Sequence, residues 1–132
     1  MLDRAQAAAG SITWQLTGRY GFGAAQPDPA LLSFVEGMSA RTPTDTIARY
    51  LRTLYGHTRY PSPALEALQR VPVLLVVGDN DPVAPASAAL ELCRSVPAAD
   101  LVTVPDSGHL VQLEQAETVT GVLLQFLKRV CP

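Results

Sequence analysis

A run of five apolar residues, Val73 to Val77, limits the folds open to this chain more than any other segment. A short strand that is apolar at every position, rather than at alternate ones, is typical of a parallel sheet covered on both faces. A second β-forming segment, residues 101–104, follows a helix predicted over residues 85–96. This strand–helix–strand order predicts a right-handed crossover onto a parallel sheet, and therefore an α/β fold.

The rest of the second half continues this alternation. A short helix is predicted to begin at Ser62-Pro63, before the first strand. A final helix is predicted over residues 115–130, because apolar side chains recur there every three or four positions. These apolar positions are Val119, Val122, Leu123, Phe126, Leu127 and Val130. We therefore take residues 61–132 as one unit of alternating strands and helices.

The first half, residues 1–60, has a different character, with helices and loops but no convincing strand. Apolar residues at i, i+3, i+4 and i+7 within residues 29–40 predict one short amphipathic helix. A second helix is predicted to begin with Thr42 as its cap and Pro43 in its first turn, and to end at Gly56. This half is therefore expected to form a helical segment separate from the strands.

Charge and composition exclude several classes of partner. The net charge is −2, the isoelectric point is near 5.6, and basic residues do not cluster, so we expect no nucleic-acid partner. No apolar stretch approaches the roughly 20 residues of a membrane span, and no secretory signal follows Met1. Cys93 and Cys131 lack metal-ligand spacing. We expect neither a metal nor a cofactor, and a cytoplasmic location.

Asp81 and His109 are the two candidate catalytic residues, because each lies just past a predicted strand. The carboxyl ends of neighbouring parallel strands meet at one edge of a sheet, where the ligand crevice of an open α/β sheet lies. We therefore expect an oxygen of Asp81 within roughly 3.5 Å of a ring nitrogen of His109. A carboxylate in that position fixes the imidazole tautomer and stabilises its cation, which is what activation of a hydroxyl nucleophile requires.

The segments around these residues resemble the α/β-hydrolase fold family. Gly78-Asp79-Asn80-Asp81, followed by Pro82, is similar to the acid motif of the family. The stretch from Gly108-His109 through apolar residues to Glu114 is similar to its histidine motif. The pair Gln115-Ala116 departs from the proline that many members have there.

The resemblance implies a fold and a set of roles. Residues 71–130 would form the last two strands and the last helix of an α/β-hydrolase, and residues 1–60 would form part of its helical lid. Asp81, rather than Asp79, would be the acid of a Ser-Asp-His triad, with His109 as its base. Asp79 and Asn80 would shape the turn, Glu114 would brace the loop or cap the last helix, and His57 would be a solvent-exposed or lid residue.

The nucleophile of such a triad has no counterpart in this sequence. A nucleophile elbow needs Gly-x-Ser-x-Gly, because the strained turn tolerates only small neighbours. The nearest match surrounds Ser39 but places the bulky Arg41 at the last position, and Ser107 stands too close to His109 in the same turn. We therefore expect the C-terminal portion of a longer hydrolase, inactive by itself.

Three functions remain open at this point. The first is a serine hydrolase segment acting on a carboxylic ester or a similar small apolar acyl substrate; dehalogenases, epoxide hydrolases and haloperoxidases are not separated from it. The second is a non-catalytic remnant that binds a ligand or a protein. The third is a small flavodoxin-like binding module, which needs more strands than residues 1–60 offer. Self-association through an exposed sheet edge is also expected, because two strands alone leave unpaired backbone groups.

Overall fold

The computed structural model describes residues 15, 17–23, 27–56 and 63–131. Two strands and six helices are labelled in it, and residues 17–20 form a helical turn before them. In chain order the labelled elements are α2 (Pro29–Ser39), α3 (Thr44–Gly56), α4 (Pro63–Leu68), β1 (Val73–Gly78), α5 (Ala86–Ser95), β2 (Ala99–Val104), α6 (Val111–Glu114) and α7 (Ala116–Val130).

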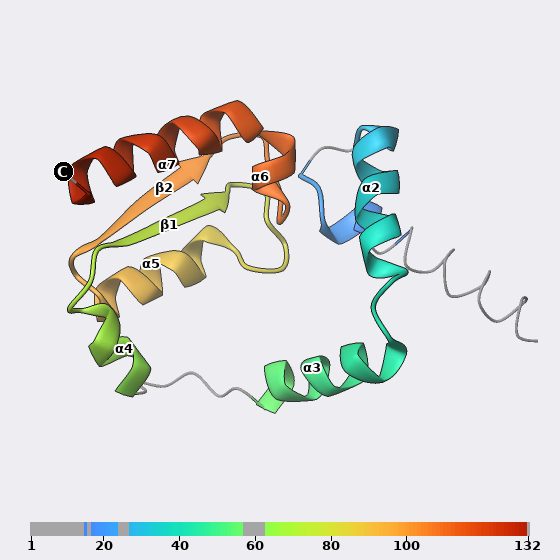
Figure 1. Ribbon diagram of the computed structural model, residues 1–132, viewed down its shortest axis with the longest axis horizontal. Coiled ribbons are helices and arrows are strands. Elements are labelled where there is room, and N and C mark those ends of the chain that lie inside the picture. Colours follow the sequence, from blue (N-terminus) through green and yellow to red (C-terminus); the bar gives the residue numbers. More distant parts are fainter. Residues whose placement is uncertain (1–14, 16, 24–26, 57–62, 132) are drawn as a thin grey trace, which may run out of the picture.

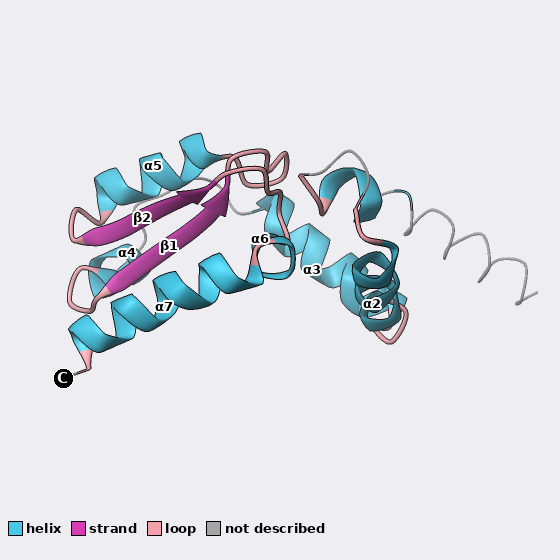
Figure 2. Cartoon of the chain, turned by 90° about the horizontal axis from the view of Figure 1, so that it is seen from above, coloured by secondary structure: helices cyan, strands magenta, loops and turns pink. Residues whose placement is uncertain are grey.

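The sheet consists of β1 and β2, which pair in parallel. Their register runs from Val73 opposite Ala99 to Gly78 opposite Val104, so the two strands end level with each other. Figures 1 and 2 show α5 on one face of this sheet and α7 on the other. The predicted strand–helix–strand–helix order and the parallel sheet are thus confirmed, and the described residues have an α/β fold.

The predicted helices of the first half are also present. Asp28 caps α2 by accepting a hydrogen bond from the Ala30 N–H, at 2.8 Å, and Pro29 follows it in the first turn. The next helix, α3, begins one residue later than the predicted Thr42 cap implies. Its first hydrogen bonds run to the carbonyl oxygen of Pro43, which therefore lies just outside the helix. The segment around Trp14 lies outside the described residues.

The apolar strand β1 is less buried than its composition predicts. Its residues Val73 to Val77 are half-buried, and only Gly78 at its end is buried. The reason is the narrowness of the sheet, since two helices cover two strands and no other described strand pairs with the free edge of β1. The buried apolar side chains instead lie mostly near the ends of the elements; they are Phe22, Leu32, Val96, Val104 and Val111.

An ion pair links α7 to the amino end of the sheet. Arg129, in its last turn, forms an ion pair with Asp100 of β2. Cations in the last turn, here Lys128 and Arg129, also interact favourably with the negative end of the helix dipole. None of the helices in the described ranges is long and apolar enough to cross a membrane.

Shortening the side chain of Val104, the last residue of β2, tests whether this end of the sheet belongs to the core. Val104 is 2% exposed, and we expect Val104→Ala to lower the free energy of unfolding by roughly 2 kcal/mol, from lost burial and the cavity left behind. The matched control is Val71→Ala, because Val71 is 50% exposed and its truncation should cost less than about 0.5 kcal/mol. Urea unfolding followed by circular dichroism measures both values. Equal losses in the two variants would contradict the prediction.

Candidate active site

The candidate site forms where the two strands end. Because Gly78 of β1 lies opposite Val104 of β2, the loops that follow them leave the sheet side by side. Backbone hydrogen bonds join these loops: the Asp79 N–H donates to the Val104 carbonyl and the Asn80 N–H donates to that of Ser107, each at 3.0 Å. The two turns therefore form one connected structure.

Asp81 and His109 meet across these loops. The distance between Nδ1 of His109 and Oδ2 of Asp81 is 3.0 Å, as the sequence predicts for their side chains. Since an ionised carboxylate only accepts hydrogen bonds, Nδ1 of His109 is the donor, and Nε2 of the neutral ring is left as an acceptor. The Asp81 side chain is 6% exposed, whereas that of His109 is 43% exposed. The acid is thus enclosed and the imidazole is open to solvent.

The second oxygen of Asp81 is held by its own loop. Oδ1 accepts hydrogen bonds from the N–H groups of Val83 at 2.8 Å and of Ala84 at 2.9 Å. Burial raises the pKa of Asp81, but the Ala84 N–H, the His109 ring and the Val83 N–H together lower the pKa below its ordinary value of 3.8. Asp81 therefore stays ionised near neutral pH while enclosed by protein.

Close backbone packing sets the distance between the loops. A Cβ atom on Gly78 would lie 2.2 Å from the carbonyl oxygen of Ser107, a separation that no side chain could occupy without a shift of the backbone. Asp79 contributes to the same junction, because its Oδ1 accepts a 3.4 Å hydrogen bond from the Ser107 N–H. Asp79 thus takes part in the turn and not in the contact with His109. Asp106 adopts a positive φ of 53°, which aspartate tolerates better than most residues.

Glu114, the last residue of α6, braces the histidine loop. Its Oε1 accepts a hydrogen bond from the Gly108 N–H at 2.7 Å, and its Oε2 accepts one from the Gly23 N–H at 2.8 Å. Bracing of the loop is one of the two roles that the sequence predicts for this residue. The participation of Gly23, 91 positions earlier, is a contact that the sequence does not predict.

Neither Ser107 nor Ser39 has the setting of a nucleophile elbow. Ser107 is fully buried, and its hydroxyl donates to the Val104 carbonyl at 2.9 Å. Ser39 is the last residue of α2 and so does not lie in a strand-to-helix turn. His57 and Ser11 lie outside the described residues. Among the residues that are described, no three of His, Cys, Asp or Glu gather where they could hold a metal ion.

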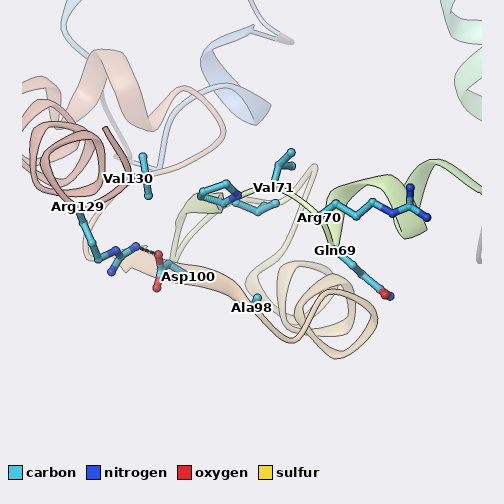
Figure 3. A pocket seen from close by; sticks show the side chains of 9 residues that line it. Gln69, Arg70, Val71, Ala98, Asp100, Arg129 and Val130 are labelled. Carbon is cyan, nitrogen blue, oxygen red and sulfur yellow. Dashed lines mark hydrogen bonds and ion pairs between the residues drawn. The ribbon is translucent and has the colours of Figure 1, made fainter. Parts of the chain in front are cut away.

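A surface pocket of about 400 Å³ lies at the opposite end of the sheet. It is lined by Val73 at the start of β1, by Asp100 near the start of β2 and by Arg129 of α7. Figure 3 shows the Arg129 side chain directed to Asp100 across this pocket. The pocket is therefore separate from Asp81 and His109, which follow the carboxyl ends of the strands.

Residues 2–122 match the alpha/beta hydrolase family, so the chain belongs to this family. The chain is 41% identical over 58 residues to a dihydrolipoyllysine-residue acetyltransferase component of an acetoin cleaving system from Pseudomonas putida. It is 31% identical over 68 residues to a proposed carbamate hydrolase, RutD, from Acinetobacter baylyi. An esterase from Exiguobacterium antarcticum has a similar structure, with a TM-score of 0.70 at 19% identity. This structural similarity shows that the chain shares the fold of the matching part of that esterase.

The chain spans only part of each of these proteins. It covers 15% of the acetyltransferase component and 26% of RutD, with 44% and 52% of its own residues aligned. The structural match covers 95% of this chain and 48% of the esterase.

The lowered pKa of Asp81 predicts how the free energy of unfolding depends on pH. A carboxyl group whose pKa is lowered by folding stabilises the fold at pH values above its ordinary pKa of 3.8. This contribution is lost as the pH falls through the pKa of the folded state. Asp81→Asn should therefore be less stable than the unsubstituted protein at pH 7, and this difference should shrink below about pH 4. Urea unfolding across this pH range measures it.

The matched control for this substitution is Asp106→Asn. Asp106 is exposed on the neighbouring loop, and asparagine also tolerates its positive φ. This variant should keep the pH dependence of the unsubstituted protein. A stability difference for Asp81→Asn that stays constant from pH 7 down to pH 3 would contradict the assignment of the lowered pKa.

Proposed function

We propose that this chain supplies the acid and the base of a Ser-Asp-His triad in a hydrolase whose nucleophile lies outside these 132 residues. The observation that supports the proposal most directly is the 3.0 Å contact of Asp81 with Nδ1 of an exposed His109. Membership of the alpha/beta hydrolase family gives the contact a chemical context. An ion pair with a purely structural role would not require this combination of an enclosed carboxylate and a solvent-exposed imidazole.

The chemistry follows from the tautomer. With the Nδ1 proton donated to Asp81, Nε2 of His109 accepts the proton of a serine hydroxyl as its oxygen attacks the acyl carbon. Asp81 stays ionised and stabilises the imidazolium that forms. The imidazolium then gives the proton to the departing oxygen, and water repeats the sequence to release the acid and regenerate the serine. Asp81 does not itself gain a proton at any step.

We propose a carboxylic ester or a related small acyl compound as substrate. Two of the similar proteins support this class, since one is an esterase and another is a proposed carbamate hydrolase. We further propose that residues 1–60 act as a cap-like helical segment and residues 61–132 as the catalytic segment. Exposed apolar side chains on α2 and α3, among them Phe34, Met38 and Tyr50, support an apolar substrate region.

The test compares this chain with the polypeptide encoded by the whole reading frame that contains it. The 132-residue chain should neither hydrolyse p-nitrophenyl esters nor react with a fluorophosphonate probe, because it has no Gly-x-Ser-x-Gly. The longer polypeptide should be labelled on one serine, and His109→Ala should lower its kcat by about 10³-fold or more. Asp106→Asn serves as the control, with kcat expected within about twofold of the unsubstituted enzyme.

Two outcomes would count against the proposal. One is stoichiometric labelling of a serine within these 132 residues. The other is an active longer enzyme whose kcat is unchanged by His109→Ala. The first result would place the nucleophile inside this chain, and the second would separate the Asp81–His109 pair from the hydrolytic reaction.

The free edge of β1 favours a second candidate, a non-catalytic binding module. No described strand pairs with this edge, and its sequence, Val-Leu-Leu-Val-Val-Gly, has none of the charges or prolines that commonly protect an edge strand. Such an edge can pair with a strand from another polypeptide or from a second copy. This module should self-associate as its concentration rises in sedimentation velocity, and a compact monomer at all concentrations would exclude pairing between copies.

A further inference from the structure

The segment Gly21–Gly23, which we call the strap, packs against the histidine loop, residues 105–110. The strap precedes α2 in the chain, and its central residue, Phe22, is 4% exposed. The carbonyl oxygen of Gly21 accepts a hydrogen bond from the Leu110 N–H at 2.7 Å. A segment from the first half of the chain is therefore joined to the loop that holds His109.

Both chain neighbours of His109 are bound to this junction. On one side, the Gly108 N–H donates to Oε1 of Glu114; on the other, the Leu110 N–H donates to the strap. The remaining oxygen of Glu114 accepts from the Gly23 N–H of the strap. One carboxylate thus links the strap to the loop, and His109 lies between the two points of attachment.

The strap and the histidine loop are closely packed at this junction. A Cβ atom on Gly23 would lie 2.4 Å from the carbonyl carbon of Ser107, so the two backbones are in direct contact. The other side of the loop is fixed by the Asn80 N–H, which donates to the carbonyl oxygen of Ser107. The histidine loop therefore lies between the turn after β1 and the strap, and a shift of either one changes the position of His109 relative to Asp81.

We propose that Glu114 is a positioning residue, which holds the His109 ring in hydrogen-bonding distance of Asp81 by tying the strap to the histidine loop. Two acceptor oxygens are needed, because two backbone amides on different segments point at the same carboxylate. The catalytic consequence rests on the proposed function: displacement of the strap would loosen His109. The structural coupling itself does not depend on that function.

The experiment replaces Glu114 with glutamine. The side chain of Glu114→Gln has nearly the same shape but only one acceptor oxygen, so one of the two amides loses its partner. Hydrogen exchange of Gly23 or Gly108 should accelerate by about tenfold or more, since hydrogen bonds to charged groups are among the stronger ones. The downfield Nδ1 proton signal of His109, which reports its contact with Asp81, should broaden or disappear.

Two further variants separate positioning from general effects. Glu117→Gln removes the same charge from the exposed first turn of α7 and should leave both measurements unchanged. Gly23→Ala displaces the strap directly and should reproduce the loss of the His109 signal. Its control is Gly37→Ala, because a Cβ atom there meets nothing within 4 Å. Amide exchange in β1 and β2 shows whether each variant remains folded.

Two results would overturn the proposal. If Gly108 exchanges faster in Glu114→Gln while the His109 signal stays the same, Glu114 braces the loop without positioning the ring. If Glu117→Gln has the same effect as Glu114→Gln, the cause is charge and not the bridge. In the longer enzyme, Glu114→Gln should lower kcat and leave KM within about twofold of the unsubstituted value. If the longer enzyme is inactive but Glu114→Gln still removes the His109 signal, the proposed hydrolase function is refuted and the positioning role of Glu114 stands.

Discussion

Parallel pairing of β1 and β2 in level register is the constraint on which the candidate site depends. With Gly78 opposite Val104, two loops that are separated in the chain by a whole helix leave the sheet at the same edge. A register shift by one residue would turn the side chains of β2 to the other face. It would also separate the acid from the imidazole, so the pairing determines both the packing of the sheet and the chemistry at its end.

The environment of Asp81 illustrates how backbone N–H groups and an imidazole together keep an enclosed carboxylate ionised. Two backbone N–H groups on one oxygen and an imidazole donor on the other outweigh the cost of burial, and the pKa of the carboxyl falls rather than rises. The backbone donors belong to the turn that begins with Pro82, so the acid is stabilised by local structure. Its partner His109 stays exposed, with its ring nitrogen Nδ1 3.0 Å from the carboxylate.

Much of this arrangement could be predicted from the sequence, because it rests on local patterns. The uninterrupted apolar run indicated a parallel strand, helical periodicity indicated α2 and α7, and the order of acid and histidine indicated their contact. The short helix α6 has no comparable signal, since Leu110 at its start offers no side-chain cap and only four residues follow. The strap was also not predictable, because its contact with Glu114 joins residues 91 positions apart through backbone amides, which every residue but proline possesses.

The tight contact between the turn after β1 and the histidine loop has a consequence for how the molecule tolerates change. Backbone atoms meet there directly, with Gly78 against Ser107, and no apolar side chain lies between them. Substitutions among the valines and leucines under α5 and α7 are therefore expected to lower the stability of the fold more than they change the distance between Asp81 and His109. A side chain at Gly78, in contrast, would push the two loops apart directly, so this position accepts less variation than the apolar positions of the helices.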